Sequence, residues 1–351
     1  MHTTRAPLAF LIERPEAFNH YLPVWRHLDR QAFDVLVLGE GRVHDEVMTM
    51  GRGHGLTMRP VGDALADGVP YRYCVTHHPM DFGDPPLIKR IATRNVRFMY
   101  TLGKAGWTFS DWNALYDLVL CYGPFQAGAL AQRFPGLPVL QMGYPRFDTF
   151  FNTAWDDDAL AREYGCDRAR PTVAWLPTWG ALSSVHAFAD AIAELRAGYN
   201  VIVKLHPLQS ANEPETVRRL EALGLNAVVS DERDNVPLFR LADYVLCDYG
   251  GSVFGALLTD RRILQLDVPG ADTSPHLGAD SPELQLRNWL PHLGPEDARF
   301  LPAILTDEGL WHRQRAVRRE LLGTFVAPLR GAAGATAALY LRNLDTIFGA
   351  G

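Results

Sequence analysis

Short apolar runs alternate with amphipathic stretches along almost the whole chain, and this alternation limits the folds that it can adopt. The apolar runs are typical of buried strands and occur at 8–12, 33–39, 71–78, 96–103, 116–123 and 137–143. The amphipathic stretches between them carry apolar residues at helical spacing, as at 16–30, 43–53 and 124–134. Strands that alternate with helices favour a parallel sheet covered on both faces. The sequence therefore predicts an α/β protein.

The alternation is interrupted once, near the middle of the chain. An acidic, polar stretch at 153–165 is followed by a proline-bearing segment at 166–171, after which strands and helices alternate again. A chain of 351 residues also exceeds the roughly 100–200 residues of a typical domain. We therefore expect Rossmann-like domains at 1–155 and 156–325. A helix at 326–351 is a candidate to pack back on the N-terminal domain.

Two Rossmann-like domains that face each other across a cleft form the glycosyltransferase-B plan. In open α/β sheets, ligands bind beyond the carboxyl ends of the strands. Residues directly after strands in the second half of the chain are therefore the first place to look for a site.

Composition argues against several classes of protein. The net charge of −6 leaves no basic surplus, so nucleic acid is not expected as a partner. The four cysteines are far apart, and no Cys-x-x-Cys pair indicates a zinc site or a disulfide framework. The apolar run at 8–12 is too short for a signal peptide or a membrane span. We expect a cytoplasmic protein, with peripheral association with the inner face of the membrane and the oligomeric state left open.

The segment VIVKLHPLQS, at 201–210, brings two basic side chains to the end of an expected strand. Lys204 and His206 are two residues apart, so in a strand both would point to one face. A cation and an imidazole together suit a diphosphate, whose negative charge must be stabilised when a phosphate ester bond breaks. A solvated lysine beside a packed histidine would explain this pattern equally well when it is taken alone.

The segment DYVLCDYGGSVFGALL, at 243–258, joins a strand to a helix through a tight turn. The strand is expected to end at Asp248, and Tyr249, Gly250, Gly251 and Ser252 form the turn. Free N–H groups at a helix N-terminus bind anions, glycines let a phosphate approach the backbone, and a serine can cap the helix. The alternative is an ordinary connection between a strand and a helix.

Two further strand ends carry candidate residues. In PTVAWLPTWG, at 171–180, Thr178 could donate to a phosphate and Trp179 could cover a base or a sugar. A proline-broken strand end with a buried tryptophan is the alternative. In QMGYPRFD, at 141–148, the turn places Arg146 and Asp148 near the expected interdomain hinge, either as an ion pair or as a ligand contact.

In this order and spacing, the motifs resemble those of the CDP-glycerol glycerophosphotransferase family, whose members build teichoic acids and related surface or capsule polymers. The motifs are GYPRFD, VAWLPTWG, VIVKLHP, DYGGSVF with RRILQLD, and FVAPLRGAAGATAALYL. The resemblance covers roughly 140–345 well and 1–135 only loosely. It implies an inverting, metal-independent transfer on a glycosyltransferase-B fold. It also implies that His206 contacts the donor phosphates and that Thr178, Gly250, Gly251 and Ser252 line the cytidine diphosphate pocket.

The sequence departs from the family where the general base is expected. The family carries Trp-His-Gly followed by a lysine, whereas here Tyr-Thr-Leu precedes Gly103 and Lys104. A base must accept the proton of an acceptor hydroxyl, which requires a histidine or a carboxylate within reach. The adjacent His77 and His78 follow the preceding strand and are the best substitutes, with Asp81 and Asp111 next.

The sequence thus predicts a transferase with an acceptor-side domain and a nucleotide-donor domain. It would move glycerol phosphate, ribitol phosphate or a sugar from a nucleotide-diphospho donor, CDP-linked for preference, to a hydroxyl of a polymer or glycan acceptor. No metal and no cofactor are expected. The alternatives are an isomerase that resembles UDP-N-acetylglucosamine 2-epimerase, which shares the glycine turn, and a non-catalytic nucleotide-binding relative, which the absent histidine would explain.

Overall fold

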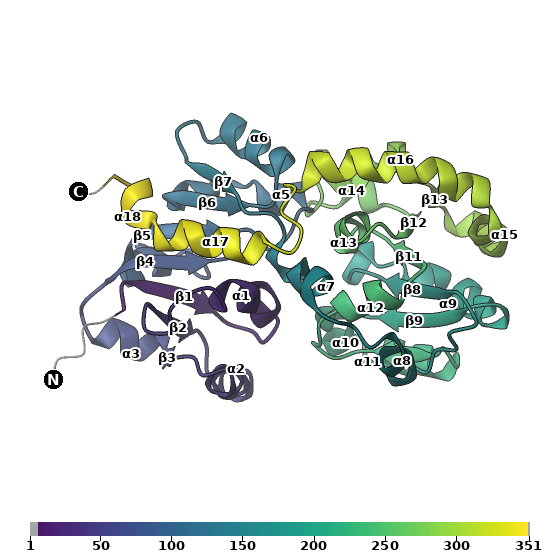
Figure 1. Ribbon diagram of the computed structural model, residues 1–351, viewed down its shortest axis with the longest axis horizontal. Coiled ribbons are helices and arrows are strands. Elements are labelled where there is room, and N and C mark those ends of the chain that lie inside the picture. The colour runs from purple at the N-terminus through teal and green to yellow at the C-terminus, as the bar shows by residue number, and fades with distance from the viewer. Residues whose placement is uncertain (1–5, 279, 350–351) are drawn as a thin grey trace. The chain divides into compact units, whose positions relative to one another are not determined.

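The computed structural model describes residues 6–278 and 280–349, which form two compact units (Figure 1). Unit 1 consists of Met1–Tyr100, Phe109–Phe151 and Val326–Gly351, and unit 2 of Thr101–Thr108 and Asn152–Phe325. The chain therefore passes from one unit to the other several times. The segment Thr101–Thr108 belongs to unit 2, although it lies inside the span expected for the N-terminal domain.

Unit 1 contains a seven-stranded sheet in the order β3-β2-β1-β4-β5-β6-β7, in which every paired strand is parallel. All residues of β1, an interior strand, are buried, as helices on both faces of a parallel sheet require. The strands are β1 (Leu8–Ile12), β2 (Phe33–Val37), β3 (Met58–Pro60), β4 (Tyr71–Thr76), β5 (Ala92–Phe98), β6 (Leu118–Cys121) and β7 (Val139–Gln141).

Helices of unit 1 come from both ends of the chain, and Figure 1 shows α17 beside α1. Asp148, in the motif GYPRFD, accepts hydrogen bonds from the N–H groups of Ala333 (3.1 Å) and Gly334 (2.6 Å) and so caps α17. The helices are α1 (Ala17–Trp25), α2 (Arg42–Gly53), α3 (Val61–Ala66), α4 (Leu87–Ile91), η1 (Asp111–Leu115), α6 (Pro124–Arg133), η2 (Pro145–Phe147), α7 (Asp148–Asn152), α17 (Ala333–Arg342) and α18 (Leu344–Ile347).

Unit 2 contains a six-stranded parallel sheet in the order β10-β9-β8-β11-β12-β13. Its core surrounds the fully buried Trp175 and Phe188. The strands are β8 (Thr172–Leu176), β9 (Asn200–Lys204), β10 (Ala227–Val229), β11 (Tyr244–Cys247), β12 (Arg262–Leu266) and β13 (His292–Leu293).

The helices of unit 2 are mostly short, and α16 is the exception. They are α5 (Ala105–Thr108), α8 (Asp157–Glu163), η3 (Gly180–Leu182), α9 (Val185–Glu194), η4 (Leu195–Ala197), α10 (Pro207–Asn212), α11 (Pro214–Ala222), α12 (Val236–Leu241), α13 (Ser252–Leu258), η5 (Ala271–Thr273), α14 (Pro282–Gln285), η6 (Leu286–Asn288), η7 (Pro295–Phe300), α15 (Leu301–Thr306) and α16 (Glu308–Phe325). Within the described ranges, none of the helices combines the length and apolar character that crossing a bilayer requires.

Each sheet has one point at which the strand order reverses. In unit 1 it lies between β1 and β4, and in unit 2 between β8 and β11. Ligands of such sheets bind beyond the carboxyl ends of the strands at the reversal. In unit 2, Thr178 and Trp179 follow β8, and Asp248 and the glycine turn follow β11. Because β8 and β11 are neighbouring parallel strands, the two loops lie side by side.

Candidate functional site

The carboxylate of Asp248 organises the loops beyond β8 and β11. Its Oδ1 accepts the N–H of Thr178 at 2.8 Å, and its Oδ2 accepts the N–H (2.8 Å) and Oγ (2.9 Å) of Ser184. Asp248 is fully buried, and this burial raises its pKa to about 6, although its hydrogen bonds act in the opposite direction. The side chain of Asp248 thus holds the loops in place, and its predicted contact with the donor stays a prediction.

The glycine turn packs closely against the loop that follows β8. A Cβ atom on Gly250 would lie 3.2 Å from the Cβ of Thr178, so a side chain there would push the two loops apart. Gly251 is exposed, and Ser252 begins α13. The structure thus brings Thr178 close to Gly250, in the turn that leads to Ser252, and the contact of these residues with a donor stays a prediction.

Trp179 is the aromatic centre of a cluster of cationic and imidazole side chains. Its ring lies 5.3 Å from the ammonium of Lys104, 6.1 Å from the ring of His206 and 6.3 Å from the ring of His276. All four residues belong to unit 2. A half-buried indole beside an ammonium and two imidazoles suits a ligand that combines an aromatic base with phosphates. We refer to Lys104, Thr178, Trp179, His206, Gly250 and Ser252 as the donor cluster.

His206 is oriented by the start of α10, for which it is the N-cap residue. Its Nδ1 accepts the N–H of Leu208 at 3.2 Å, so the neutral ring carries its proton on Nε2. Nε2 is thus the nitrogen that can donate to an anionic ligand. His206 is partly exposed, in contrast to a core histidine.

Lys204 does not share a strand face with His206. The strand β9 ends at Lys204, so the alternation on which that prediction rested stops before His206. The ammonium of Lys204 instead donates to the carbonyl oxygens of Asp231 (2.7 Å) and Leu205 (3.3 Å), and the side chain is buried. These contacts give Lys204 a role in joining β9 to the loop after β10.

Tyr249 also faces the protein interior. It is 5% exposed, and the guanidinium of Arg287 lies 3.7 Å from the centre of its ring. Arg287 in turn binds Asp267 at 2.6 Å and the carbonyl of Glu283 at 2.6 Å. Tyr249 thus packs against Arg287, and its predicted contact with the donor stays a prediction.

In unit 1, His77 follows β4 as predicted, but its ring is enclosed by aromatic side chains. It stacks on Tyr21 (4.6 Å) and Tyr100 (4.9 Å) and is only 9% exposed. Burial, aided by the charges of His78 and Arg97, holds its pKa well below the ordinary value. His77 is consequently poorly placed to meet a substrate.

His78 is the more accessible of the two histidines. Its side chain is 23% exposed, its Nδ1 accepts the N–H of Met80 at 3.3 Å, and its Nε2 lies 3.8 Å from a carboxylate oxygen of Glu13. Burial lowers its pKa and outweighs the opposing effect of Glu13. Because Nδ1 accepts the Met80 N–H, the neutral ring carries its proton on Nε2, and it can accept a further proton only at Nδ1, once that hydrogen bond is released.

Sequence reasoning missed His20, which lies 5.3 Å from His77, centre to centre, on the buried face of α1. Its pKa is well below the ordinary value because of burial and the nearby charge of Arg146. The helical spacing of His20 with the apolar Val24, four residues later, was the available signal. Arg146 itself lies in η2, and Asp111 is exposed at the start of η1. Both belong to unit 1 and not to the donor cluster.

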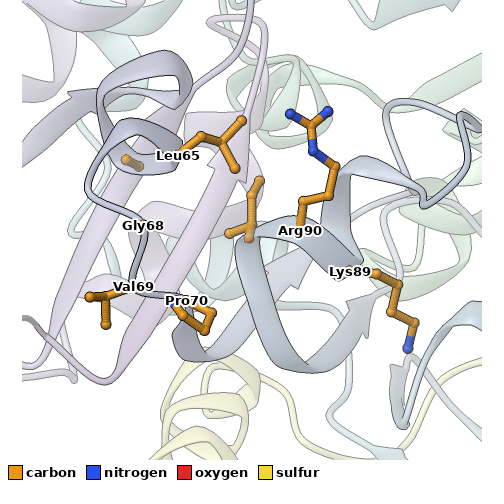
Figure 2. A pocket seen from close by; sticks show the side chains of 8 residues that line it. Leu65, Gly68, Val69, Pro70, Lys89 and Arg90 are labelled. Atoms are coloured by element: carbon orange, nitrogen blue, oxygen red, sulfur yellow. The ribbon is translucent and has the colours of Figure 1, made fainter.

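Unit 1 also contains a cavity of about 220 Å³ (Figure 2). Its lining residues are Ala64, Leu65, Gly68, Val69, Pro70, Lys89, Arg90 and Ile91. Most of them directly precede β4 or β5, so the cavity lies at the amino ends of these strands. Figure 2 shows the Lys89 side chain directed away from the cavity. The cavity is therefore separate from His77 and His78, which follow the carboxyl end of β4.

Within residues 6–278 and 280–349, no three His, Cys, Asp or Glu side chains gather in a way that could hold a metal ion.

Comparisons with solved structures show which fold the chain adopts. A variant of the wall teichoic acid polymerase TagF soaked with CDPG superposes with a TM-score of 0.71 at 12% identity, over 99% of this chain and 91% of that chain. HepE of Anabaena, in complex with UDP and glucose, gives 0.60 at 13% identity, over 97% and 99%. A glycosyltransferase from Rickettsia africae gives 0.56 at 10% identity, over 98% and 99%. The predicted α/β class, with Rossmann-like units of the glycosyltransferase-B type, is confirmed.

One comparison of sequence gives a match to a family model. No curated protein sequence matches the chain. Residues 95–266 match the sequence model described as CDP-Glycerol:Poly(glycerophosphate) glycerophosphotransferase. This span includes Lys104, Trp179, His206 and the glycine turn, which are the elements of the donor cluster. The match covers just under half of the chain and agrees with the resemblance to this family that the motifs predicted.

Proposed function

We propose that this protein transfers glycerol phosphate from a CDP-linked donor to a hydroxyl group of a cell-wall polymer. The observation that carries the proposal is the donor cluster, in which the ammonium of Lys104 lies 5.3 Å and the ring of His206 lies 6.1 Å from the Trp179 ring. The family match supports the type of reaction. The structural similarity to TagF, a wall teichoic acid polymerase that was soaked with CDPG, supports the choice of donor.

The cluster has the chemistry that a nucleoside diphosphate requires. Trp179 offers an aromatic face to the base or the glycerol, and Lys104 and His206 offer a cation and an N–H donor to the phosphates. The backbone N–H groups of the turn at Gly250, Gly251 and Ser252 can bind the remaining phosphate oxygens. These groups would stabilise the negative charge that grows on the departing nucleotide.

The reaction is a substitution at phosphorus. The oxygen of the acceptor hydroxyl attacks the phosphorus that carries glycerol and forms a phosphodiester bond with it. The bond from that phosphorus to the bridging oxygen of the diphosphate breaks, and CMP leaves with the electron pair. The proton of the hydroxyl passes to a base. We assign this role to His78 in preference to His77, because His78 is the more exposed of the two.

Binding of CDP to His206 variants tests the proposal. A hydrogen bond to a charged ligand contributes about 1.5–3 kcal/mol, so His206→Ala should weaken CDP binding roughly 10- to 100-fold in isothermal titration calorimetry. His206→Ala should also slow release of CMP from CDP-glycerol in the presence of a glycerol phosphate polymer.

The matched control is His186→Ala. His186 lies on α9 of the same unit, is 61% exposed and pairs with Glu213 at 3.1 Å, so its loss should leave CDP binding unchanged. Equal affinity of the wild type and His206→Ala for CDP would overturn the proposed donor site.

A further inference from the structure

The turn that carries Lys104 is held by a segment about 180 residues later in the chain. Glu283 Oε1 accepts the N–H of Lys104 at 2.8 Å, and Ser281 Oγ accepts the N–H of Ala105 at 2.8 Å. The carbonyl of Leu277 accepts the N–H of Gly106 at 3.1 Å. Three successive N–H groups of the turn are thus bound by one short stretch of unit 2.

Glu283 is buried in a way that is unusual for a carboxyl group. Its side chain is fully buried, and within the described part of the chain Oε2 has no hydrogen-bond partner. Burial raises its pKa to about 7, against the opposing charges of Lys104 and Arg287. A carboxyl group that is this costly to bury indicates a function beyond packing.

Gly103 is shaped to fit this carboxyl group. A Cβ atom on Gly103 would lie 1.7 Å from Glu283 Oε1, so no larger residue can occupy the position while the contact exists. Thr108 Oγ1 closes the turn by donating to the carbonyl of Gly103 at 2.6 Å.

Lys104 takes a backbone conformation that needs this support. Its φ angle of 56° lies in the left-handed region, which a residue with a side chain rarely adopts unless its surroundings hold it there. In this conformation the ammonium lies 5.3 Å from the centre of the Trp179 ring, and burial lowers its pKa while the charges of Glu283 and Asp248 raise it.

We propose that Glu283 is the positioning residue of the donor site: by binding the N–H of Lys104, it holds the Gly103–Gly106 turn so that the ammonium stays over Trp179 and can pair with a donor phosphate. The inference rests on the proposed function for the identity of the ligand. The position of the ammonium over Trp179 is a property of the protein alone, and it can be tested without a ligand.

The position of the Lys104 ammonium can be followed by NMR, because the chain contains only three lysines, Lys89, Lys104 and Lys204. Reductive methylation with ¹³C-formaldehyde gives a resolved NMR signal for each lysine, and lysine-to-arginine variants assign them. The ring current of Trp179 should shift the Lys104 signal away from the chemical shift of a solvated lysine, and Trp179→Leu should remove this displacement.

Two substitutions of Glu283 separate the effect of its hydrogen bond to the turn from the effect of its negative charge. Glu283→Gln keeps an oxygen that accepts the Lys104 N–H, so the displaced signal should persist while the pKa of Lys104 falls, because a nearby carboxylate is lost. Glu283→Ala removes the acceptor, so the Lys104 signal should move toward the position of a solvated lysine. The Lys89 and Lys204 signals should not change. A Lys104 signal that remains displaced in Glu283→Ala would overturn the inference.

A milder variant covers the case in which Glu283→Ala does not fold. Ser281→Ala releases only the Ala105 N–H, and it should move the Lys104 signal in the same direction by a smaller amount.

Titration with CDP then connects the position of the turn to the proposed function. Glu283→Ala should bind CDP about 10-fold more weakly than the wild type, and Glu283→Gln should stay within about 3-fold of it. If the wild type does not bind CDP, the proposed function fails but the NMR result on Lys104 stands. If CDP binds the wild type and Glu283→Ala equally, the inference fails and the proposed function stands.

Discussion

Asp248 and Thr178 follow neighbouring strands, and a hydrogen bond of 2.8 Å from the Thr178 N–H to Asp248 Oδ1 joins the two strand ends. The second oxygen of the same carboxylate binds Ser184, at the far side of the loop that carries Trp179. One buried side chain therefore determines the shape of the loop over which the donor is proposed to bind.

The burial of Asp248 should make stability depend on pH. The pKa of Asp248 is raised to about 6 in the folded protein, whereas it is about 3.9 in an unfolded chain. The folded state thus binds this proton more tightly. The resulting stability is fully present below about pH 4 and is lost as the pH rises through about 6, with a total loss of roughly 3 kcal/mol.

Urea unfolding of the wild type and Asp248→Asn at a series of pH values from 4 to 7 measures this effect. Asp248→Asn has no titrating carboxyl group at this position, so the stability difference between the two proteins should change by about 2 kcal/mol between pH 4 and 7. The pKa of Glu283 is also raised, but Glu283 is present in both proteins, so its contribution to the pH dependence cancels in the difference. Parallel pH profiles would contradict the prediction.

Trp179 should account for a large part of nucleotide affinity. Stacking of a base on an aromatic side chain is worth about 1–3 kcal/mol, so Trp179→Leu should weaken CDP binding roughly 5- to 100-fold. CDP should quench tryptophan fluorescence in the wild type, and this CDP-dependent part should disappear in the variant. The control is Trp289→Leu, because Trp289 belongs to the same unit and is 63% exposed. Equal quenching in Trp179→Leu would argue against stacking.

The order of strands and helices could be predicted because each strand of these sheets is a continuous apolar run. The runs at β1, β8 and β11 are buried on both faces and are bounded by polar residues or proline. The positions of Thr178 and the glycine turn followed from the same signal, since both come directly after strands.

Contacts between distant segments could not be predicted in this way. The placement of Lys104 in unit 2 depends on hydrogen bonds to Glu283 and Ser281. The sequence gives no sign that Glu283, a single glutamate in a polar stretch, will be buried. The apolar character of 96–103 also extends beyond the end of β5 at Phe98, because Met99 and Leu102 are buried without being in the strand. An apolar run thus predicts which residues are buried, but it does not predict the residue at which the strand ends.

The two histidines after β4 should differ in their effect on catalysis. His78→Ala should reduce the transfer rate by about 10²-fold or more, as expected when a general base is lost. His77→Phe should retain most activity, because phenylalanine can preserve the stack with Tyr21 and Tyr100.

The pH dependence of kcat/KM gives a second readout on His78. The pKa of His78 lies below its ordinary value of about 6.5. The base is therefore deprotonated at neutral pH, and the acidic limb of the profile should lie below pH 6.5. A profile that loses activity already between pH 8 and 7 would contradict this assignment.

Gly334 should be essential for the contact between α17 and α1. A Cβ atom at this position would lie 2.3 Å from the carbonyl oxygen of Pro23 and 3.1 Å from Asp148 Oδ2, the oxygen that caps α17. Because the first of these is a backbone atom in α1, it cannot rotate out of the way. Gly334→Ala should therefore displace α17 and destabilise unit 1 by about 1–3 kcal/mol.

Gly323→Ala provides the matched control, because Gly323 lies inside α16 and a Cβ atom there would meet nothing within 4 Å. Alanine restricts the unfolded chain more than glycine, so this variant should be more stable than the wild type by about 0.5–1 kcal/mol. Urea unfolding of both variants should give effects of opposite sign. If both substitutions stabilise the protein, α17 does not pack on α1 through Gly334, and the cap that Asp148 provides would not depend on that close approach.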